Sequence, residues 1–288
     1  MSRQGGLKEA EHAARERALG YQKDSIGSER RAAPVVLRSD KGAIVNLQLN
    51  RPDELNCLSE AVLVALGHEF SAIAKDDRIK CVVISGAGRA FCAGHDLKEM
   101  QSRSSVDYYR GLFAMCSDMM RGINGARVPV IAKVHGDATA AGCQLVAACD
   151  MAIASTTARF AAAGINLGSF CATPAVAITR KIPANRAFEM LFAGRLLDAA
   201  TAAEWGLVNR AVPPDELDQT VDELAAIIAS KSGEALRFGK SQFYKQREMN
   251  LAEAYEFASE GISNSLASAE AQEGIDAFLS KRKAVWKT

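Results

Sequence analysis

Short apolar runs separated by turns of small residues dominate the middle of the chain. The runs Cys81–Ser85 and Val130–Val134 are continuous and rich in β-branched residues, which is typical of buried strands. Each run is followed by a turn rich in Gly and Ala and then by a helical pattern, one beginning near Asp96 and the other spanning Cys143–Ala148. The pattern therefore predicts two strand–turn–helix units.

The second turn, Gly136–Gly142, consists almost wholly of Gly, Ala, Thr and Asp, so no bulky side chain covers its backbone. The first N–H groups of a helix have no partner inside the helix and can therefore reach a ligand. Such donors suit an anion or a developing oxyanion. The pattern alone leaves two interpretations open: the two turns converge on one ligand, or both are tight packing turns.

The remaining elements follow from the same patterns. Val35–Leu37 and Ala43–Leu49 are predicted to pair as strands across a turn at 39–42, and Ser59 is a predicted N-cap of a helix that reaches about Lys75. Further predicted elements are a helix at 106–123, strands at 151–154, 159–162 and 207–212, and helices near 175–181, 184–192, 198–206, 215–231, 233–247, 251–267 and 268–280. Strands before residue 212 and helices after it predict an α/β core with a helical C-terminal segment.

These patterns predict three divisions: an N-terminal extension at 1–33, a core at 34–212 and a helical region at 213–288. The first is polar and charged and shows no face that would match the core. A nucleotide-binding domain is not indicated, because the fragment Gly86–Gly88 lacks the third glycine of a dinucleotide fingerprint and no GxxxxGK[ST] phosphate loop occurs in the chain.

Charge and cysteine usage narrow the class of protein further. The 35 basic and 34 acidic residues nearly cancel, so nucleic acid and anionic membranes are not expected partners. Seven cysteines without CxxC spacing favour reduced thiols over disulfides or a metal site. No apolar run approaches the roughly 20 residues that span a bilayer, and acidic residues interrupt the N-terminus, unlike a mitochondrial transit peptide. A cytoplasmic location is therefore predicted.

Two segments carry a specific resemblance. CVVISGAGRAFCAGHDLKEM and VPVIAKVHGDATAAGCQLVAACDMAIAS are similar to the two signature segments of the crotonase (enoyl-CoA hydratase/isomerase) superfamily. The similarity continues through LNRPDELNCLS, FAGRLLDAATAAEWGLVNRAVP and EGIDAFLSKRKAVW, and so covers roughly residues 35–288 in order. GHDLKEM together with ATAAGCQLVA and NLGSFCATP resembles the branch of enoyl-CoA hydratase domain-containing proteins.

The resemblance implies an α/β fold in which ββα units coil into a crotonase-like spiral, followed by a helical C-terminal trimerisation region. It also implies a homotrimer or a hexamer formed by two trimers. The expected ligand is an acyl-CoA thioester, with coenzyme A entering as part of that ligand and no separate cofactor or metal. The carbonyl oxygen of the thioester would lie between two backbone N–H groups.

Roles for individual residues follow from the same resemblance. The implied oxyanion donors are the backbone N–H groups of Ala93 and Ala141. Residues implied to contact the acyl-CoA are Asp53, Leu55, Cys57, Gly94, His95, Asp96, Leu97, Ala140, Leu167 and Lys281. The run Lys281–Lys283 lies where the family often contacts phosphate, although a solvated charge run fits the same sequence.

The chain departs from the family at both catalytic acids. Family hydratases use one glutamate in a GGGCE segment, where this chain has Gln144, and a second in a PEI-type segment, where it has Gly164. A neutral amide can orient water but is not an ordinary general base, and glycine has no side chain. The sequence therefore predicts that standard hydration is doubtful.

Other residues offer alternatives. His95 adjoins an implied donor, so it is either a chemical group or a packing and CoA contact, and Asp96 is either a ligand contact or a helix cap. Weaker candidates for chemistry are His135, Asp137, Cys143, Ser169 and Cys171. Three functions stay open: an enoyl-CoA hydratase/isomerase homologue with unusual chemistry, an inactive acyl-CoA-binding regulator or carrier, and a structural partner that binds no CoA.

Overall fold

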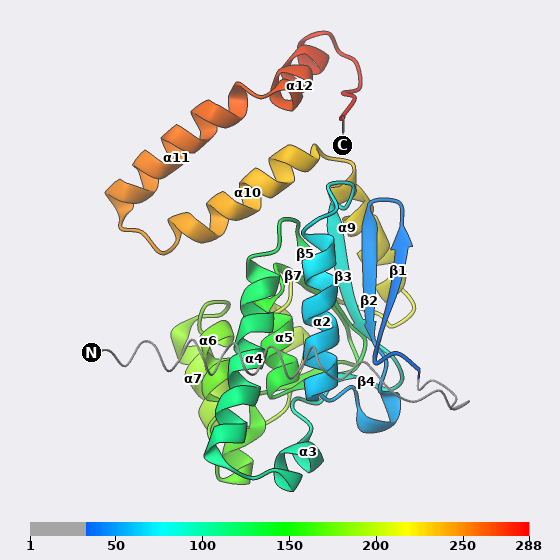
Figure 1. Cartoon of the computed structure of the whole chain (residues 1–288), viewed down its shortest axis with the longest axis vertical. Helices are drawn as coiled ribbons and strands as arrows, with labels where there is room; N and C mark the ends of the chain where they lie inside the picture. Colours follow the sequence, from blue (N-terminus) through cyan, green and yellow to red (C-terminus); the bar gives the residue numbers. More distant parts are fainter. Residues whose placement is uncertain (1–32, 288) are drawn as a thin grey trace, which may run out of the picture. The chain divides into compact units, whose positions relative to one another are not determined.

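Two β-sheets build the core of the protein, whose computed structural model describes residues 33–287 (Figure 1). The six-stranded sheet contains, in spatial order, β1 (Val36–Lys41), β2 (Ile44–Leu49), β3 (Cys81–Gly86), β5 (Val130–Val134), β7 (Met151–Ser155) and β10 (Arg210–Val212). The four-stranded sheet contains β4 (Ala90–Cys92), β6 (Asp137–Thr139), β8 (Arg159–Ala161) and β9 (Leu197–Asp198). The pairs β1–β2 and β8–β9 are antiparallel and the others are parallel.

Helices surround the two sheets and continue to the C-terminus. They are η1 (Pro52–Glu54), α2 (Glu60–Ile73), α3 (Leu97–Ser102), α4 (Val106–Asn124), α5 (Ala141–Ala148), η2 (Ala163–Leu167), α6 (Ala172–Ile178), α7 (Ala184–Ala193), α8 (Ala199–Glu204), α9 (Leu217–Ala229), α10 (Gly233–Gln246), α11 (Leu251–Leu266) and α12 (Ala269–Leu279). Residues from Pro34 onward form one unit, and the predicted N-terminal extension lies outside the described residues.

The chain passes from the large sheet to the small sheet three times. β3 leads to β4, β5 to β6 and β7 to β8, and helices follow each second strand. Because the strands of successive units pair in parallel within each sheet, the units stack along one axis as a spiral. The predicted fold class, repeated ββα units followed by C-terminal helices, is confirmed.

The central strands of the large sheet, β3, β5 and β7, are buried on both faces. In β3, Val82 and Ile84 belong to the main core with α2 and α4, whereas Cys81 and Val83 pack with Leu217 and its neighbours on α9. A strand covered on both sides has no polar face, so its sequence is a continuous apolar run. This is why CVVIS and VIAKV were recognisable as strands from sequence.

Of the small sheet, only β8 was predicted, as a strand at 159–162. β4 and β6 have three residues each and lie in the two segments that were predicted to be turns of small residues. Three residues cannot display a period of two over enough positions to be distinguished from a turn. The first hairpin also differs, because β1 continues to Lys41 and the turn is reduced to Gly42 and Ala43, with Gly42 at φ +62°.

Helix boundaries agree with the predicted caps. The side chains of Ser59, Asp96 and Asp198 each accept a backbone N–H from the first turn of the helix that follows. A polar side chain at this position satisfies a donor that the helix itself leaves unpaired. Asp96 therefore acts as a helix cap, which was one of the two interpretations of this residue.

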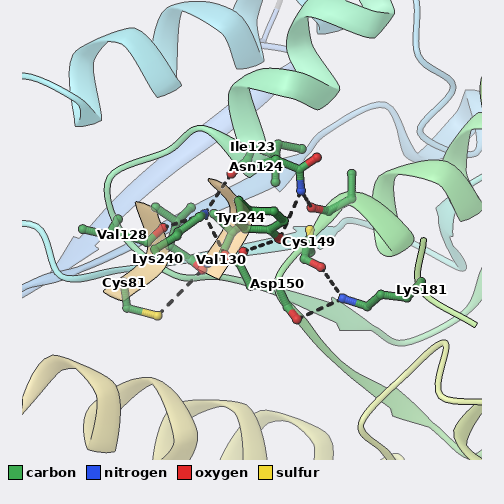
Figure 2. Close-up of polar contacts among 12 residues, drawn as sticks. Cys81, Ile123, Asn124, Val128, Val130, Cys149, Asp150, Lys181, Lys240 and Tyr244 are labelled. Atoms are coloured by element: carbon green, nitrogen blue, oxygen red, sulfur yellow. Dashed lines mark hydrogen bonds and ion pairs between the residues drawn. The ribbon is translucent and has the colours of Figure 1, made fainter. Parts of the chain in front are cut away.

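A buried lysine anchors α10 to the spiral core (Figure 2). Lys240 Nζ donates to the carbonyl oxygens of Ile123 at 2.9 Å and Val128 at 3.0 Å, and to Asp150 Oδ2 at 2.7 Å. Burial lowers the pKa of Lys240, whereas the carboxylate of Asp150 opposes that shift. All three donor positions of the ammonium group are thus used, which compensates for its removal from water.

Asp150 is the centre of this group of contacts, which Figure 2 shows between α5 and β7. Its Oδ2 also accepts the N–H of Val130 at 2.6 Å, and its Oδ1 accepts the hydroxyl of Tyr244 at 2.8 Å. Lys181 Nζ donates to the carbonyl oxygens of Cys149 at 2.6 Å and Asp150 at 2.9 Å. The carboxyl end of α5 is therefore fully bound to neighbouring elements.

Replacing Lys240 by methionine should destabilise the protein by about 3–5 kcal/mol, because it leaves a largely buried Asp150 without its cation. The matched control is Lys245→Met on the exposed side of the same helix, which should change stability by less than about 0.5 kcal/mol. The free energy of unfolding of both variants is measured by urea denaturation. Equal stability of the two variants would contradict the anchoring role of Lys240.

Candidate functional site

Two segments that are distant in sequence pair beside the start of α3. The N–H of Ala93 donates to Leu55 O at 3.0 Å, the N–H of Leu58 donates to Gly94 O at 2.7 Å, and the N–H of Asp96 donates to Leu58 O at 3.4 Å. These two segments contain most of the residues that the resemblance implies to contact the acyl-CoA. The structure brings them together along one short backbone ladder.

The same loop packs directly against the start of α5. A Cβ at Gly94 would lie 3.0 Å from Ala140 Cβ, 3.1 Å from Thr139 O and 3.3 Å from Ala141 N. Gly94 also has φ +99°, a conformation that residues with a Cβ rarely adopt. Thr139 Oγ1 adds a hydrogen bond to Ala93 O at 3.0 Å. The two small-residue turns therefore meet, and this contact is compatible with both sequence interpretations, convergence on one ligand and tight packing.

The residue that precedes α5 is conformationally strained. Ala140 has φ +50° and ψ −117°, a combination that is natural for glycine and costly for alanine. A Cβ at Gly142 would overlap the carbonyl oxygen of Cys92, so the first turn of α5 touches β4 without any intervening side chain. The strain at Ala140 and the close contact at Gly142 fix where the first N–H groups of α5 point.

Two backbone donors remain free where the turns meet. Within residues 33–287, neither the N–H of His95 nor that of Ala141, the first residue of α5, donates to another protein group. The N–H of Ala93 is different, because it already donates to Leu55 O. This hydrogen bond removes Ala93 from the candidate oxyanion donors and leaves His95 and Ala141 as the available pair.

Gln144 lies one helical turn after Ala141 and is only 4% exposed. Its Oε1 is buried, and within the described chain its carboxamide has no hydrogen-bond partner. Most buried polar atoms in proteins are paired, because an unpaired buried acceptor costs about 1–3 kcal/mol. Gln144 therefore offers an acceptor that a bound molecule can use.

The imidazole of His95 is the second unpaired group. Its Nε2 is buried without a partner in the described residues, and its ring contacts Phe113 edge-on at a centroid distance of 5.2 Å. Burial lowers the pKa of His95 to about 4. The ring is therefore neutral at pH 7, and no carboxylate is bonded to it that would raise its basicity.

Gly164 and Cys171 form one packed pair beside α5. The N–H of Gly164 donates to Cys171 Sγ at 3.2 Å, and a Cβ at Gly164 would lie 2.8 Å from that sulfur atom. The thiol therefore occupies the volume that a side chain at position 164 would need. Burial raises the pKa of both Cys171 and Cys143, to about 12 for Cys143, so neither thiol is a ready nucleophile.

Asp96 ties the loop to the neighbouring segment as well as capping α3. Its Oδ2 accepts Arg51 Nη2 at 3.1 Å, while Oδ1 accepts the N–H groups of Lys98 and Glu99. Burial would raise the pKa of Asp96, but the hydrogen bonds from Glu99 and Arg51 outweigh that effect and lower it. Asp96 is thus a charged structural group of the loop rather than a free acid.

Two weaker candidates for chemistry already have structural partners. His135 Nε2 bonds to Gly88 O at 2.8 Å, and Asp137 pairs with Arg159 at 2.9 and 2.7 Å. The first contact connects the turn between β5 and β6 to the turn between β3 and β4, and the second connects strand β6 to strand β8. Both side chains therefore have a structural role, because they join neighbouring units of the spiral.

The remaining predicted ligand contacts are distributed unevenly. Asp53 lies in η1, Leu55 follows it in the left-handed region at φ +53°, and Cys57 is half-buried. Leu97 and Leu167 are large exposed apolar residues. The exposed Lys281, by contrast, lies beyond α12, and its backbone bond runs to Phe278 within the same segment. A role for these residues in binding stays a prediction.

Sequence reasoning missed two features of this site. The free N–H of His95 lies two residues beyond the predicted Ala93, because the ladder to Leu55 could not be foreseen from spacing. The interaction of Cys171 with Gly164 was equally hidden, since the two residues are joined through a loop. Gly94 was the available signal for the first feature, because a glycine with positive φ reverses the direction of the next N–H.

In the part of the chain that the structure describes, no three His, Cys, Asp or Glu side chains gather as metal ligands would. None of the helices between residues 33 and 287 combines the length and the apolar character needed to cross a bilayer.

The fold and the paired turns define a class of protein. The family described as enoyl-CoA hydratase/isomerase matches residues 39–288. The chain therefore belongs to this family, the crotonase superfamily to which the sequence was similar.

Particular relatives narrow the comparison. The chain is 41% identical to rat "Enoyl-CoA hydratase domain-containing protein 3, mitochondrial", over 91% of this chain and 89% of that protein. The human protein of the same name is 42% identical, over 92% of this chain and 88% of that protein. The crystal structure of human enoyl coenzyme A hydratase domain-containing protein 3 has a TM-score of 0.85 and covers 88% of this chain and 100% of its own. The crystal structure of an enoyl-CoA hydratase from Mycobacterium smegmatis has a TM-score of 0.87 and 47% sequence identity. This match covers 89% of this chain and 100% of that chain.

The relatives correct the predicted location. Those from rat, mouse and human are named mitochondrial, which contradicts the cytoplasmic location inferred from the cysteines and from the acidic residues of the N-terminus. The cysteines fail as an indicator because burial alone keeps them apart: within the described residues all seven are free thiols, and six are buried. Reduced thiols therefore do not distinguish the two compartments.

The lowered pKa of His95 predicts a pH dependence of stability. Between pH about 6.5 and about 4 the unfolded chain binds a proton that the folded protein does not, so stability should fall as the pH falls through this window. The full shift of the His95 pKa corresponds to about 3 kcal/mol in the free energy of unfolding. His95→Phe, which keeps an aromatic ring, should remove this part of the pH dependence in urea unfolding.

The control is His68→Phe on the exposed face of α2, which should leave the pH dependence unchanged. A wild-type curve and a His95→Phe curve with the same slope between pH 4 and 6.5 would show that the imidazole is not buried in its neutral form.

Proposed function

We propose that this protein binds acyl-CoA thioesters and holds the thioester carbonyl oxygen between the backbone N–H groups of His95 and Ala141. The observation that carries the proposal is the pair of unused donors where the two turns meet. Two fixed N–H groups in a site shielded from water stabilise partial negative charge on a carbonyl oxygen. Leu55 and Gly94 lie in the paired segments that would contact the CoA part.

The same site is poorly equipped for hydration of a double bond. Hydration needs a group that removes a proton from water and a group that protonates the second carbon, and each such group contributes about a hundred- to ten-thousandfold. Gln144 is a neutral amide, Gly164 has no side chain, and the Cys171 thiol fills the space beside it. We infer that acyl-CoA binding without appreciable hydratase activity, as in a carrier or regulatory protein, is the function that this geometry supports best.

An enzyme of the lyase or isomerase type is the second candidate. It is supported by one observation, the neutral imidazole of His95 with an unpaired Nε2 next to the donor pair. A base whose pKa is about 4 removes protons from water weakly at pH 7, so this candidate ranks below simple binding. No cofactor or metal beyond the CoA of the thioester is included in either proposal.

Assembly into a trimer, or into a hexamer of two trimers, is part of the proposal. Helix α11 has no buried residue, and large apolar side chains on α11 and α12 face outward, among them Leu251 at 75% exposure and Phe278 at 82%. Contiguous exposed apolar surface of this kind marks an interface in soluble proteins. By analogy with the relatives named mitochondrial, we place the protein in mitochondria.

Calorimetric titration with butyryl-CoA and crotonyl-CoA should show saturable binding, and the crotonyl-CoA absorbance should stay constant during the same incubation. The matched variants are Gly94→Ala and Gly42→Ala. Both place alanine at a positive φ, but only Gly94 has neighbours within 4 Å, which belong to Thr139, Ala140 and Ala141 at the passage from β6 to α5. Gly94→Ala should weaken binding about tenfold, the effect of losing about one hydrogen bond to the ligand, and Gly42→Ala should not.

Turnover of crotonyl-CoA by the wild type at a typical hydratase rate would contradict the binding proposal. Absence of binding by folded protein to either thioester would contradict both the binding and the enzyme candidates.

Hydratase activity should appear only when three residues are changed together. Gln144→Glu and Gly164→Glu supply the two missing carboxylates, but the new side chain at 164 would meet Cys171 Sγ. Adding Cys171→Ala removes that sulfur atom. The triple variant should hydrate crotonyl-CoA at least about a hundredfold faster than the wild type, and the double variant should show little gain.

The control measurements are thermal stability and butyryl-CoA binding of each variant. A folded triple variant that binds butyryl-CoA but shows no increase in hydration would refute the roles assigned to positions 144 and 164.

A further inference from the structure

We propose that acyl-CoA binding and association of the chains through α11 and α12 favour the same docked position of α10, so that each strengthens the other. This coupling rests on the proposed function, since the ligand is taken to lie at the amino end of α5 and the assembly surface on the C-terminal helices. It adds a regulation of that site, because the bound thioester would control how firmly the chains are held together.

Helix α10 is attached to the core mainly by polar contacts. Within the described chain it buries only Gly233 and Lys240, whereas Leu236 and Phe238 are half-buried and Phe243 is exposed. Burial of an apolar stripe is what usually fixes a helix on a core. Because α10 buries little apolar surface, its position depends on the bonds that its polar side chains make.

Two of these side chains bond to one carboxylate. Lys240 and Tyr244 are four residues apart, so they lie on the same face of α10. Lys240 Nζ donates to Asp150 Oδ2 at 2.7 Å, and the hydroxyl of Tyr244 donates to Asp150 Oδ1 at 2.8 Å (Figure 2). Asp150 follows two residues after Ala148, the last residue of α5. Helix α10 therefore holds the carboxyl end of α5.

Asn124, the last residue of α4, completes the connection. Its Nδ2 donates to Ala148 O at 2.8 Å and to the hydroxyl oxygen of Tyr244 at 3.2 Å. If α10 moved away, Asp150 would lose its cation and the Tyr244 hydroxyl, and partly broken arrangements would leave buried polar groups unpaired. We therefore distinguish two states of α10, docked with these bonds made and undocked with them broken.

Helix α5 connects the docked state to the ligand. It has eight residues, all of them buried, and is about 12 Å long. A closely packed interior transmits a displacement instead of absorbing it. A change in how the carboxyl end of α5 is held therefore alters the position of the N–H of Ala141. A ligand that needs this N–H in place favours docked α10.

Helix α11 connects the docked state to the assembly surface. Only residues 247–250 separate it from α10, and its apolar residues Leu251, Tyr255 and Ile262 are exposed in the single chain. Association that covers these residues would restrain α11 and, through the short connection, α10. Two binding events that favour one state strengthen each other, and the coupling is reciprocal.

A static anchor is the alternative. If α10 stays docked in the separated chain, ligand binding and association have no equilibrium in common, and neither affects the other. The two cases differ in the rate at which chains leave the assembly with and without bound thioester.

The test measures subunit exchange by energy transfer between two populations labelled with different dyes, with and without saturating butyryl-CoA. Tyr244→Phe keeps the aromatic ring and removes both hydroxyl bonds, so exchange should be faster than in the wild type. Butyryl-CoA should slow the exchange of this variant at least about fivefold, the lower end of typical allosteric couplings, because affinity changes appear mostly in dissociation rates. The wild type should be slowed by a smaller factor, because more of it is docked.

A second variant and a control complete the design. Lys240→Met also removes the cation and should respond to butyryl-CoA at least as strongly as Tyr244→Phe, and circular dichroism checks that it is folded. The matched control is Lys245→Met on the exposed side of α10, which should behave as the wild type does. Calorimetry with butyryl-CoA checks that each variant binds.

The outcomes separate the two proposals. If no thioester binds the folded wild type, the proposed function fails and the coupling fails with it. If butyryl-CoA binds but leaves the exchange of Tyr244→Phe unchanged, the coupling is overturned while the proposed binding stands. The coupling is also overturned if Tyr244→Phe exchanges no faster than the wild type, if Lys245→Met responds as Tyr244→Phe does, or if no mixture shows energy transfer.

Discussion

The contact between the first turn of α5 and β4 is the constraint on which the rest of the site depends. Gly142 lies against the carbonyl of Cys92 and Gly94 lies against Ala140, so the helix and the loop approach as closely as backbones can. This approach leaves no room for side chains between the turns. It brings the N–H groups of His95 and Ala141 to one place, and it explains why Ala140 adopts a conformation that alanine normally avoids.

The two ends of α5 differ in how their polar groups are satisfied. At the carboxyl end, Lys240, Asp150 and Lys181 bond to each other and to backbone carbonyls. At the amino end, the N–H of Ala141 and the amide of Gln144 are unpaired among the described residues. The complete set of hydrogen bonds at the carboxyl end fixes the position of α5. The unpaired groups at the amino end can therefore bind a ligand without a rearrangement of the protein.

The sequence predicted elements that have a long periodic signal or a cap. Cys81–Ser85, the helix after Ser59 and the C-terminal helices were found because burial or capping imposes a pattern on many residues. The short strands β4, β6 and β9 and the pairing of Leu55 with Ala93 were not predicted. Strands of two or three residues carry no period, and backbone ladders between distant segments leave no mark on residue type. Ala141 lies at the first position of α5, and in the other turn the N–H without a protein acceptor belongs to His95, two residues beyond Ala93.

Helix α11 adds a consequence for the folded state as a whole. Because none of its residues is buried within a single chain, its side chains contribute little to holding it against the core. A helix of 16 residues is marginally stable in water without tertiary contacts. In the proposed assembly, the order of this segment would therefore follow mass action: dilution would loosen α11 first, and the apparent melting temperature would depend on the amount of protein present.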